Sequence, residues 1–112
     1  MKLHRYLSSA GIDLIKEYID SLTKEERIDG YSVLDSMEKG EFDKIKYKPW
    51  AKRVYEVYFY KHNRIFYIVA DGDNIYLLHA CRKQKNKTEK QDKKIVIERA
   101  KELGKLLGKK FI

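Results

Sequence analysis

The sequence has little of what marks secreted, zinc-binding or membrane-spanning chains. Its 112 residues include one cysteine, Cys81, so no internal disulfide can form and a secreted disulfide scaffold is excluded. One cysteine and three scattered histidines do not supply a structural zinc site. No run approaches the ~20 apolar residues of a membrane span, and the first residues hold no apolar core of signal-peptide length. We therefore expect a cytoplasmic protein without membrane contact, metal or other cofactor.

Linker residues are also scarce. Proline occurs once, at Pro49, and there is no Pro/Gly-rich linker, internal repeat or low-complexity tract. A chain of 112 residues suits a single domain with one modest core. We therefore predict one domain over residues 1–112.

Positive charge is what the sequence has in excess. Lysine and arginine number 25 against 17 acidic residues, which gives a formal net charge of +8. Such a balance in a small domain favours a polyanionic partner: RNA, DNA, an acidic protein or anionic lipid. The same charge can also serve only to keep a protein in solution, so charge alone selects no partner.

Hydrophobic periodicity predicts two helices in the first half, after a short strand over residues 2–8. Ser9 is a candidate cap of the first helix. Thr23 and Glu26 form a capping-box pattern that starts the second helix, and Gly40 ends it. The residues expected to face the core are Ile12, Ile15, Ile19 and Leu22, then Ile28, Tyr31, Leu34 and Met37.

The middle of the chain predicts a sheet. Runs rich in β-branched and aromatic residues occupy 54–60, 64–70 and 75–82. Both breaks are short and polar, so we predict an antiparallel three-stranded meander, with Asp71 and Asp73 in a turn and not in a metal site. Residues 41–52 are expected to form an irregular connector, and a last helix starts near Asp92. The predicted fold class is α+β: an N-terminal strand and helical hairpin, the meander and a C-terminal helix.

No common catalytic motif is present, and the candidate site is a basic, aromatic cluster at one end of the predicted sheet. Antiparallel pairing places Arg82 and Lys83, at the end of the last strand, beside Arg64, at the start of the middle one. An arginine matches phosphate oxygens, a crowded lysine is a possible base, and a tyrosine can stack on an unpaired base. These groups suit metal-independent attack of a ribose 2′-hydroxyl on its neighbouring phosphate. The alternative is a solvated charged loop after a strand. His79 and Cys81 fit core positions better than catalytic ones.

The stretch from Tyr55 to Leu103 resembles the phage-derived branch of the RelE/HigB toxin superfamily. The resemblance rests on four segments: Arg64-Ile65-Phe66-Tyr67, Asp71-Gly72-Asp73-Asn74, Leu77-Leu78-His79-Ala80-Cys81-Arg82-Lys83 and Lys87-Thr88-Glu89. It implies a small sheet flanked by helices, ribosome-dependent cleavage of mRNA, and a cognate antitoxin that often carries a helix-turn-helix domain. Family members often have Glu-Leu-Arg in the first meander strand, where this chain has Glu56-Val57-Tyr58.

Carried over by position, the resemblance makes Arg64 and Lys83 the candidate catalytic residues. The predicted RNA contacts are Arg53, Tyr58, Lys61, Arg82, Lys85 and Lys87. Three functions stay open at this point. The first is an endoribonuclease toxin of a type II toxin–antitoxin system. The others are a ParE-like toxin that inhibits DNA gyrase and a non-catalytic phage-derived module that binds RNA or protein.

Overall fold

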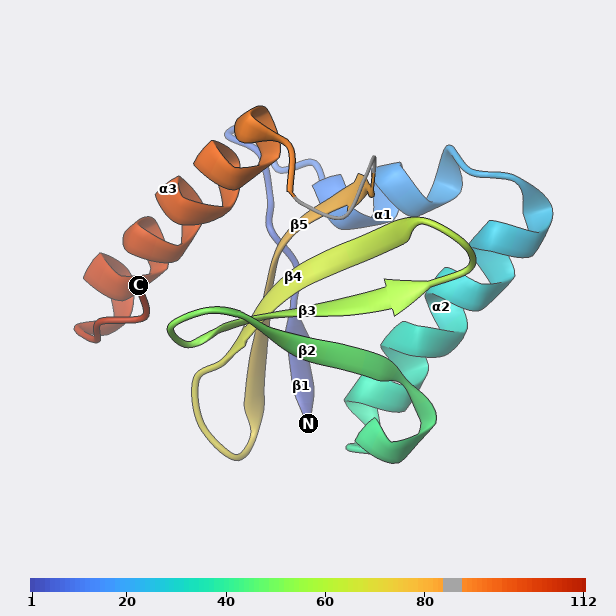
Figure 1. Cartoon of the computed structure of the whole chain (residues 1–112). Coiled ribbons are helices and arrows are strands. Elements are labelled where there is room, and N and C mark those ends of the chain that lie inside the picture. The colour runs from blue at the N-terminus through green and yellow to red at the C-terminus, as the bar shows by residue number, and fades with distance from the viewer. Residues whose placement is uncertain (84–87) are drawn as a thin grey trace.

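A five-stranded β-sheet with helices on both faces forms the molecule (Figure 1). The computed structural model describes residues 1–83 and 88–112. In chain order the elements are β1 (Lys2–His4), α1 (Leu14–Asp20), α2 (Lys24–Glu38), the 3₁₀ helix η1 (Phe42–Lys44), β2 (Lys46–Ala51), β3 (Val54–Phe59), β4 (Asn63–Val69), β5 (Asn74–Arg82) and α3 (Lys90–Leu107). The predicted α+β class is confirmed.

The sheet has the order β1-β5-β4-β3-β2. β2 to β5 are antiparallel neighbours in chain order, so the predicted pairing of the three central strands is confirmed. β1 pairs in parallel with β5 and is shorter than the strand predicted over 2–8. The prediction of an irregular connector over 41–52 was wrong for its second half, which forms β2. Its lysines and Pro49 resemble a loop in sequence, yet they suit a sheet edge, where proline and charge are tolerated.

Local capping fixes where the helices begin. The capping box is confirmed, because the Thr23 hydroxyl accepts the Glu26 N–H while the Glu26 carboxylate accepts the Thr23 N–H. The prediction that Ser9 caps the first helix was wrong: Asp13 does so, accepting the Lys16 N–H at 2.9 Å. A carboxylate at this position accepts hydrogen bonds from the free backbone N–H groups of the first turn. Its negative charge is also stabilised by the positive end of the helix dipole.

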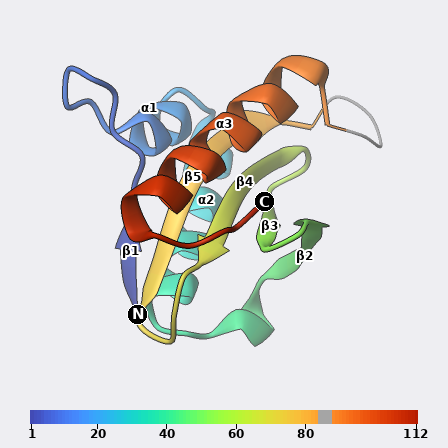
Figure 2. The ribbon, with the colours of Figure 1, turned by 90° about the vertical axis from the view of Figure 1, so that its left-hand side faces the viewer.

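The sheet separates two hydrophobic cores. Figure 2 shows α3 on one side of the sheet and α1 and α2 on the other. The helical hairpin α1–α2 packs on one face, where Ile15, Ile19, Leu34 and Met37 meet strand residues such as Ile65. Helix α3 packs on the other face, with Val96, Ala100 and Leu103 against strand residues that include Phe66 and Ile68. The prediction that Ile28 points inward was wrong, because this residue is 61% exposed.

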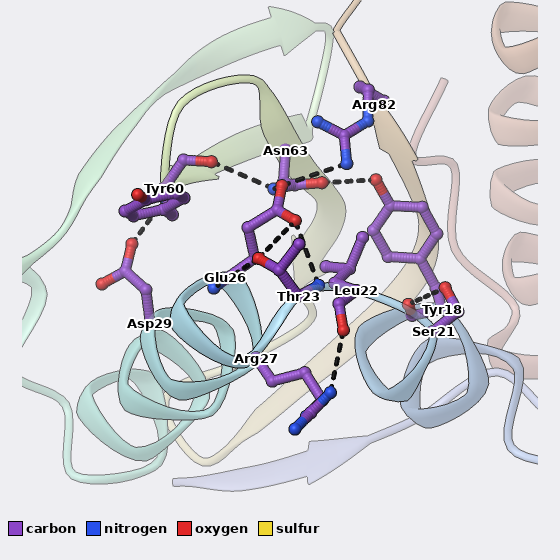
Figure 3. A network of polar contacts seen from close by, with 10 residues as sticks. All are labelled: Tyr18, Ser21, Leu22, Thr23, Glu26, Arg27, Asp29, Tyr60, Asn63 and Arg82. Carbon is purple, nitrogen blue, oxygen red and sulfur yellow. Dashed lines mark hydrogen bonds and ion pairs between the residues drawn. The ribbon is translucent and has the colours of Figure 1, made fainter.

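A polar network fastens the helical hairpin to the sheet (Figure 3). Glu26 accepts hydrogen bonds from Asn63 Nδ2 at 2.9 Å and from Arg82 Nη2 at 3.0 Å. Asn63 is fully buried, and its Oδ1 accepts the Tyr18 hydroxyl at 2.6 Å. One carboxylate therefore caps α2 and also binds β4 and β5. These bonds hold the pKa of Glu26 down at about 2, with the Asn63 bond as the largest cause.

After α3 the chain folds back onto the sheet (Figure 2). Gly108 takes a left-handed conformation with φ of 66°, and the Lys109 N–H bonds to the Gly104 carbonyl. This reversal inserts Phe111, which is 2% exposed, into the core beneath α3. Within the described residues, none of the helices combines the length and apolar character needed to cross a bilayer.

Candidate functional site

The strand register aligns polar side chains on the sheet face that α3 covers in part. Lys46, Tyr58 and Arg64 form one cross-strand row over β2, β3 and β4. Lys48 and Glu56 are paired in the next row of the same face. Side chains two residues apart on a strand share a face, so the two rows present one continuous polar surface.

A cleft of about 610 Å³ lies over these rows, between the sheet and α3. Its described lining residues are Lys48, Pro49, Trp50, Ala51, Lys52, Glu56, Tyr58, Arg64, Lys83, Thr88, Lys93, Ile97 and Ile112. Five of these side chains are cationic and one is acidic. The cleft therefore favours an anion, and its low-dielectric walls strengthen that preference.

A buried ion pair forms the floor of the cleft. Arg64 is 2% exposed and Glu56 is 1% exposed, and Arg64 Nη1 lies 3.3 Å from Glu56 Oε2. Arg64 Nη1 also donates to Thr88 Oγ1 at 3.2 Å, and Thr88 accepts the Trp50 indole N–H at 2.9 Å. The guanidinium is thus held by neighbours from β3 and from the residues that precede α3.

The wall of the cleft places two ammonium groups against one aromatic ring. Lys83 Nζ lies 5.1 Å and Lys48 Nζ 5.5 Å from the centre of the Tyr58 ring, within the range of cation–π attraction. Among the described residues no carboxylate lies within ion-pair distance of Lys83. The Tyr58 hydroxyl is buried and has no hydrogen-bond partner there either. Lys83 therefore brings to this wall of the cleft a positive charge that no carboxylate of the described residues offsets.

Comparison with known families identifies the chain. The model of the family described as phage-derived protein Gp49-like (DUF891) matches residues 17–101, which include most of the cleft. The chain belongs to this family. It is a family associated with toxins of type II toxin–antitoxin systems. No curated protein matches the sequence.

The cleft of this Gp49-like protein contains three of the residues selected from sequence: Arg64, Lys83 and Tyr58. Their roles stay predictions, but they lie together as the antiparallel register requires. Arg64 is deeply buried for a residue near the start of a strand, and Glu56 of β3 and Thr88, before α3, bind its guanidinium.

The structure places the other predicted RNA contacts elsewhere. Arg82 is the last residue of β5 and pairs with Asn63, so it points to the face opposite that of Arg64 and binds Glu26. Arg53 directly precedes β3 and stacks on Phe111. Lys61 lies on the ring of Tyr60 in the β3–β4 turn. Lys85 and Lys87 lie outside the described residues.

Sequence reasoning missed Glu56, Lys48 and Lys93 as parts of the cleft. A signal existed for Glu56, because an acid with a valine on either side, at 54 and 57, within an apolar strand indicates a buried partner of opposite charge. For Lys48 and Lys93 there was no such signal. Each is one of many lysines, and only strand pairing and the position of α3 bring them here.

A cluster of His79, Cys81 and Asp92 lies between β5 and α3, with potential ligand atoms within 4.8 Å of one another. Arg99 Nη1 lies 3.5 Å from His79 Nδ1, and a guanidinium can only donate, so Nδ1 accepts. Nε2 then carries the proton and donates to Asp92 Oδ1 at 2.8 Å, which leaves it no lone pair for a metal. Burial lowers the pKa of His79 and raises that of the Cys81 thiol to about 12. The cluster therefore joins α3 to the sheet. This agrees with the sequence prediction that His79 is a hydrogen-bonded core residue.

Proposed function

We propose that this Gp49-like protein is the toxin of a type II toxin–antitoxin system and a ribosome-dependent endoribonuclease of the RelE/HigB type. The observation that carries the proposal is the basic cleft in which Lys83 and Tyr58 adjoin the buried Arg64–Glu56 pair. The arrangement of helices and sheet is compatible with the small RelE-like fold. The family's association with toxins points in the same direction.

The proposed reaction needs no group beyond the RNA and the protein. The ribose 2′-oxygen attacks the adjacent phosphorus while the bond from phosphorus to the 5′-oxygen breaks, which leaves a cyclic phosphate and a 5′-hydroxyl. The 2′-hydroxyl gives up one proton, and the leaving oxygen takes one up. Lys83, at the surface of the cleft, contacts the phosphate, and Arg64 beneath it adds positive potential where charge develops in the transition state. Tyr58 lines the cleft and offers its ring to a base.

The decisive experiment is single-turnover cleavage of mRNA on programmed ribosomes, with the RNA ends mapped. Wild-type protein should cut within translated codons. Lys83→Ala should lower the saturated cleavage rate by roughly a hundredfold, in the range found for loss of one transition-state donor. Lys101→Ala is the matched control, because Lys101 is an exposed lysine of α3 outside the cleft, and it should cut at the wild-type rate.

Arg64 is tested in the same assay. Arg64→Lys keeps the charge beside Glu56 but loses the planar fork, so it should reduce cleavage at saturation more than it reduces binding. Cleavage at the wild-type rate by either the Lys83 or the Arg64 variant would show that the residue is not catalytic. A DNA-damage response without RNA cuts would favour gyrase inhibition, and harmless expression would favour a non-catalytic module.

We also propose a cognate antitoxin as the partner. The net charge of +8 and the basic cleft favour an acidic or amphipathic segment that covers or displaces part of this surface. Helix-turn-helix proteins encoded beside the toxin are the first candidates. Co-expression with the neighbouring gene product should restore growth and yield a complex on purification. Failure of every neighbouring protein to bind or rescue would contradict this part of the proposal.

A further inference from the structure

A second pocket lies on the other face of the sheet from the cleft, beside the turn between β2 and β3. Its volume is about 440 Å³, and its described lining residues are Phe42, Tyr47, Lys52, Arg53, Tyr55, Tyr67 and Val69. Tyr55 alternates with Glu56 along β3, which places the two on opposite faces. None of the cleft residues with a proposed role in cleavage lines this pocket.

The walls of the pocket are aromatic rings at stacking distances. The rings of Tyr55 and Tyr67 stack with centres 5.8 Å apart, and that of Tyr47 lies 6.3 Å from Tyr55. Phe42 meets Tyr47 edge to face at 5.6 Å. Tyr47 is 47% exposed, so its side chain is accessible to a ligand. Such a surface accepts another flat ring, because aromatic pairs gain energy beyond simple burial.

One hydroxyl of the pocket has no hydrogen-bond partner among the described residues. Tyr67 is 1% exposed, yet its hydroxyl makes no hydrogen bond with any described residue, and its oxygen is not sealed off from solvent. Burial raises the pKa of this phenol, so it stays protonated and can donate. Because its oxygen is accessible and Tyr67 lines the pocket, this hydroxyl can donate a hydrogen bond to a ligand there.

The rim of the pocket is positively charged. Lys52 sits at the β2–β3 turn with φ of 54°, and it is exposed. Arg53 is held by its stacking on Phe111 at 4.9 Å and by a bond from its Nη2 to the Val69 carbonyl at 3.4 Å. No acidic side chain is found among the described residues that line the pocket. The pocket therefore combines aromatic rings, on which a base can stack, with two cations at its rim, which can bind the phosphate of the same nucleotide.

The pocket and the cleft are connected around the β2–β3 turn. Lys52 lines both of them, and Ala51 and Lys52 of the cleft directly precede Arg53 of the pocket. A single-stranded RNA bound in the cleft can therefore pass over this turn and reach the opposite face of the sheet without leaving positively charged surface.

We propose that this pocket binds one unpaired nucleotide of the RNA whose reacting phosphate lies in the cleft. Its base stacks on Tyr47 and Tyr55, the Tyr67 hydroxyl donates to the base edge, and Lys52 and Arg53 hold the phosphate. The inference rests on the proposed function and extends it, since it assigns a second contact on the far face of the sheet. An acidic peptide matches the cations but leaves the exposed aromatic side chain of Tyr47 unexplained.

The test is the affinity for single-stranded RNA whose 2′-hydroxyls are methylated, so that it binds but cannot be cut. Fluorescence anisotropy should be measured with a long oligonucleotide that reaches both sites and with a dinucleotide that fills the cleft alone. Tyr47→Ala should weaken binding of the long RNA by roughly tenfold, as expected for the loss of one stacked base, and leave the dinucleotide unchanged. Tyr67→Phe keeps the ring and removes only the hydroxyl, so it should cause a smaller loss for the long RNA alone.

Tyr60→Ala is the matched control, because Tyr60 is a similarly exposed tyrosine at the opposite end of β3, and both RNAs should bind it as they bind wild type. Equal affinity of wild type, Tyr47→Ala and Tyr67→Phe for the long RNA would overturn the inference, even if mRNA is cleaved. If only the complex with the antitoxin weakens, the pocket is a protein-docking site and the inference is wrong. Tyr47-dependent binding without cleavage would instead overturn the ribonuclease activity alone.

Discussion

At the scale of single residues, the cleft depends on a charge pair that is almost completely shielded from water. Arg64 and Glu56 are almost completely buried, and Glu56 Oε1 also lies 3.9 Å from Lys48 Nζ. Transferring such charges out of water is expensive, and the pairing offsets that cost only while both partners are present. Arg64 is therefore a structural residue as well as the proposed source of positive potential under the phosphate.

Removal of one member of this pair should show the structural role. Arg64→Ala leaves the Glu56 carboxylate buried without its guanidinium, and we expect a loss of about 3–5 kcal/mol in the free energy of unfolding. The double variant Arg64→Met with Glu56→Leu should be clearly more stable than Arg64→Ala, because it buries no unpaired charge. Urea denaturation measures both. A single variant as stable as wild type would show that the pair contributes little.

The second residue-scale prediction concerns pH. The pKa of Glu26 falls from 4.5 to about 2 on folding, so its contribution to stability is complete above the unfolded value and is lost as pH falls from about 4.5 to 2. Glu26→Gln cannot ionise, so wild type should exceed this variant in stability by a constant margin at neutral pH, and the margin should shrink through that window. Denaturation curves of both proteins across this pH range provide the check. A margin independent of pH would contradict the role assigned to the Glu26 carboxylate.

At the scale of elements, α3 is held in place from both ends. The His79–Asp92 hydrogen bond fixes its first turn to β5. The reversal after Gly108 fixes its last turn, since Phe111 returns to the core that α3 covers. Because Lys93, Ile97 and Ile112 line the cleft, the position of α3 also sets the shape of the proposed RNA site.

Gly104 tests this arrangement, because a Cβ at this position would lie 2.6 Å from the Lys109 carbonyl oxygen. Gly104→Ala should displace the reversed segment and destabilise the protein by about 1–3 kcal/mol, the usual range for overpacking. Gly72→Ala is a suitable control, because its added Cβ would meet nothing within 4 Å. Thermal melts of the two variants should therefore differ clearly. Equal stability would show that the segment after α3 moves aside without loss.

At the scale of the whole molecule, the net charge of +8 predicts binding to RNA that depends on salt. Each phosphate that a lysine neutralises on a single strand contributes about 0.7 to the slope of log affinity against log salt. Lys83→Ala should reduce the slope by about this amount, whereas Lys101→Ala should leave it unchanged. Anisotropy titrations of methylated RNA at several salt concentrations test this. Identical slopes for the three proteins would show that Lys83 does not contact a phosphate.

The local sequence determined most of the elements of this protein. The capping box at Thr23 and Glu26 identified α2. The runs of β-branched and aromatic residues with short polar breaks identified the order of β3, β4 and β5, because these patterns act between near neighbours. The same antiparallel order brought Arg64 and Lys83 to one cleft. The pairing of Arg82 with Asn63 places Arg82 on the face opposite that of Arg64, although the sequence interpretation grouped the two.

Tertiary structure alone decided the remaining features. β2 has the lysines and proline of a loop, and it becomes a strand because β3 offers it a partner. That pairing places Lys48 beside Glu56 and creates one wall of the cleft. The pocket opposite joins Phe42 to Tyr67, which are distant in sequence and meet only after the sheet has formed. Patterns in sequence report interactions between near neighbours, whereas a site assembled from several strands depends on the register and packing of the complete fold.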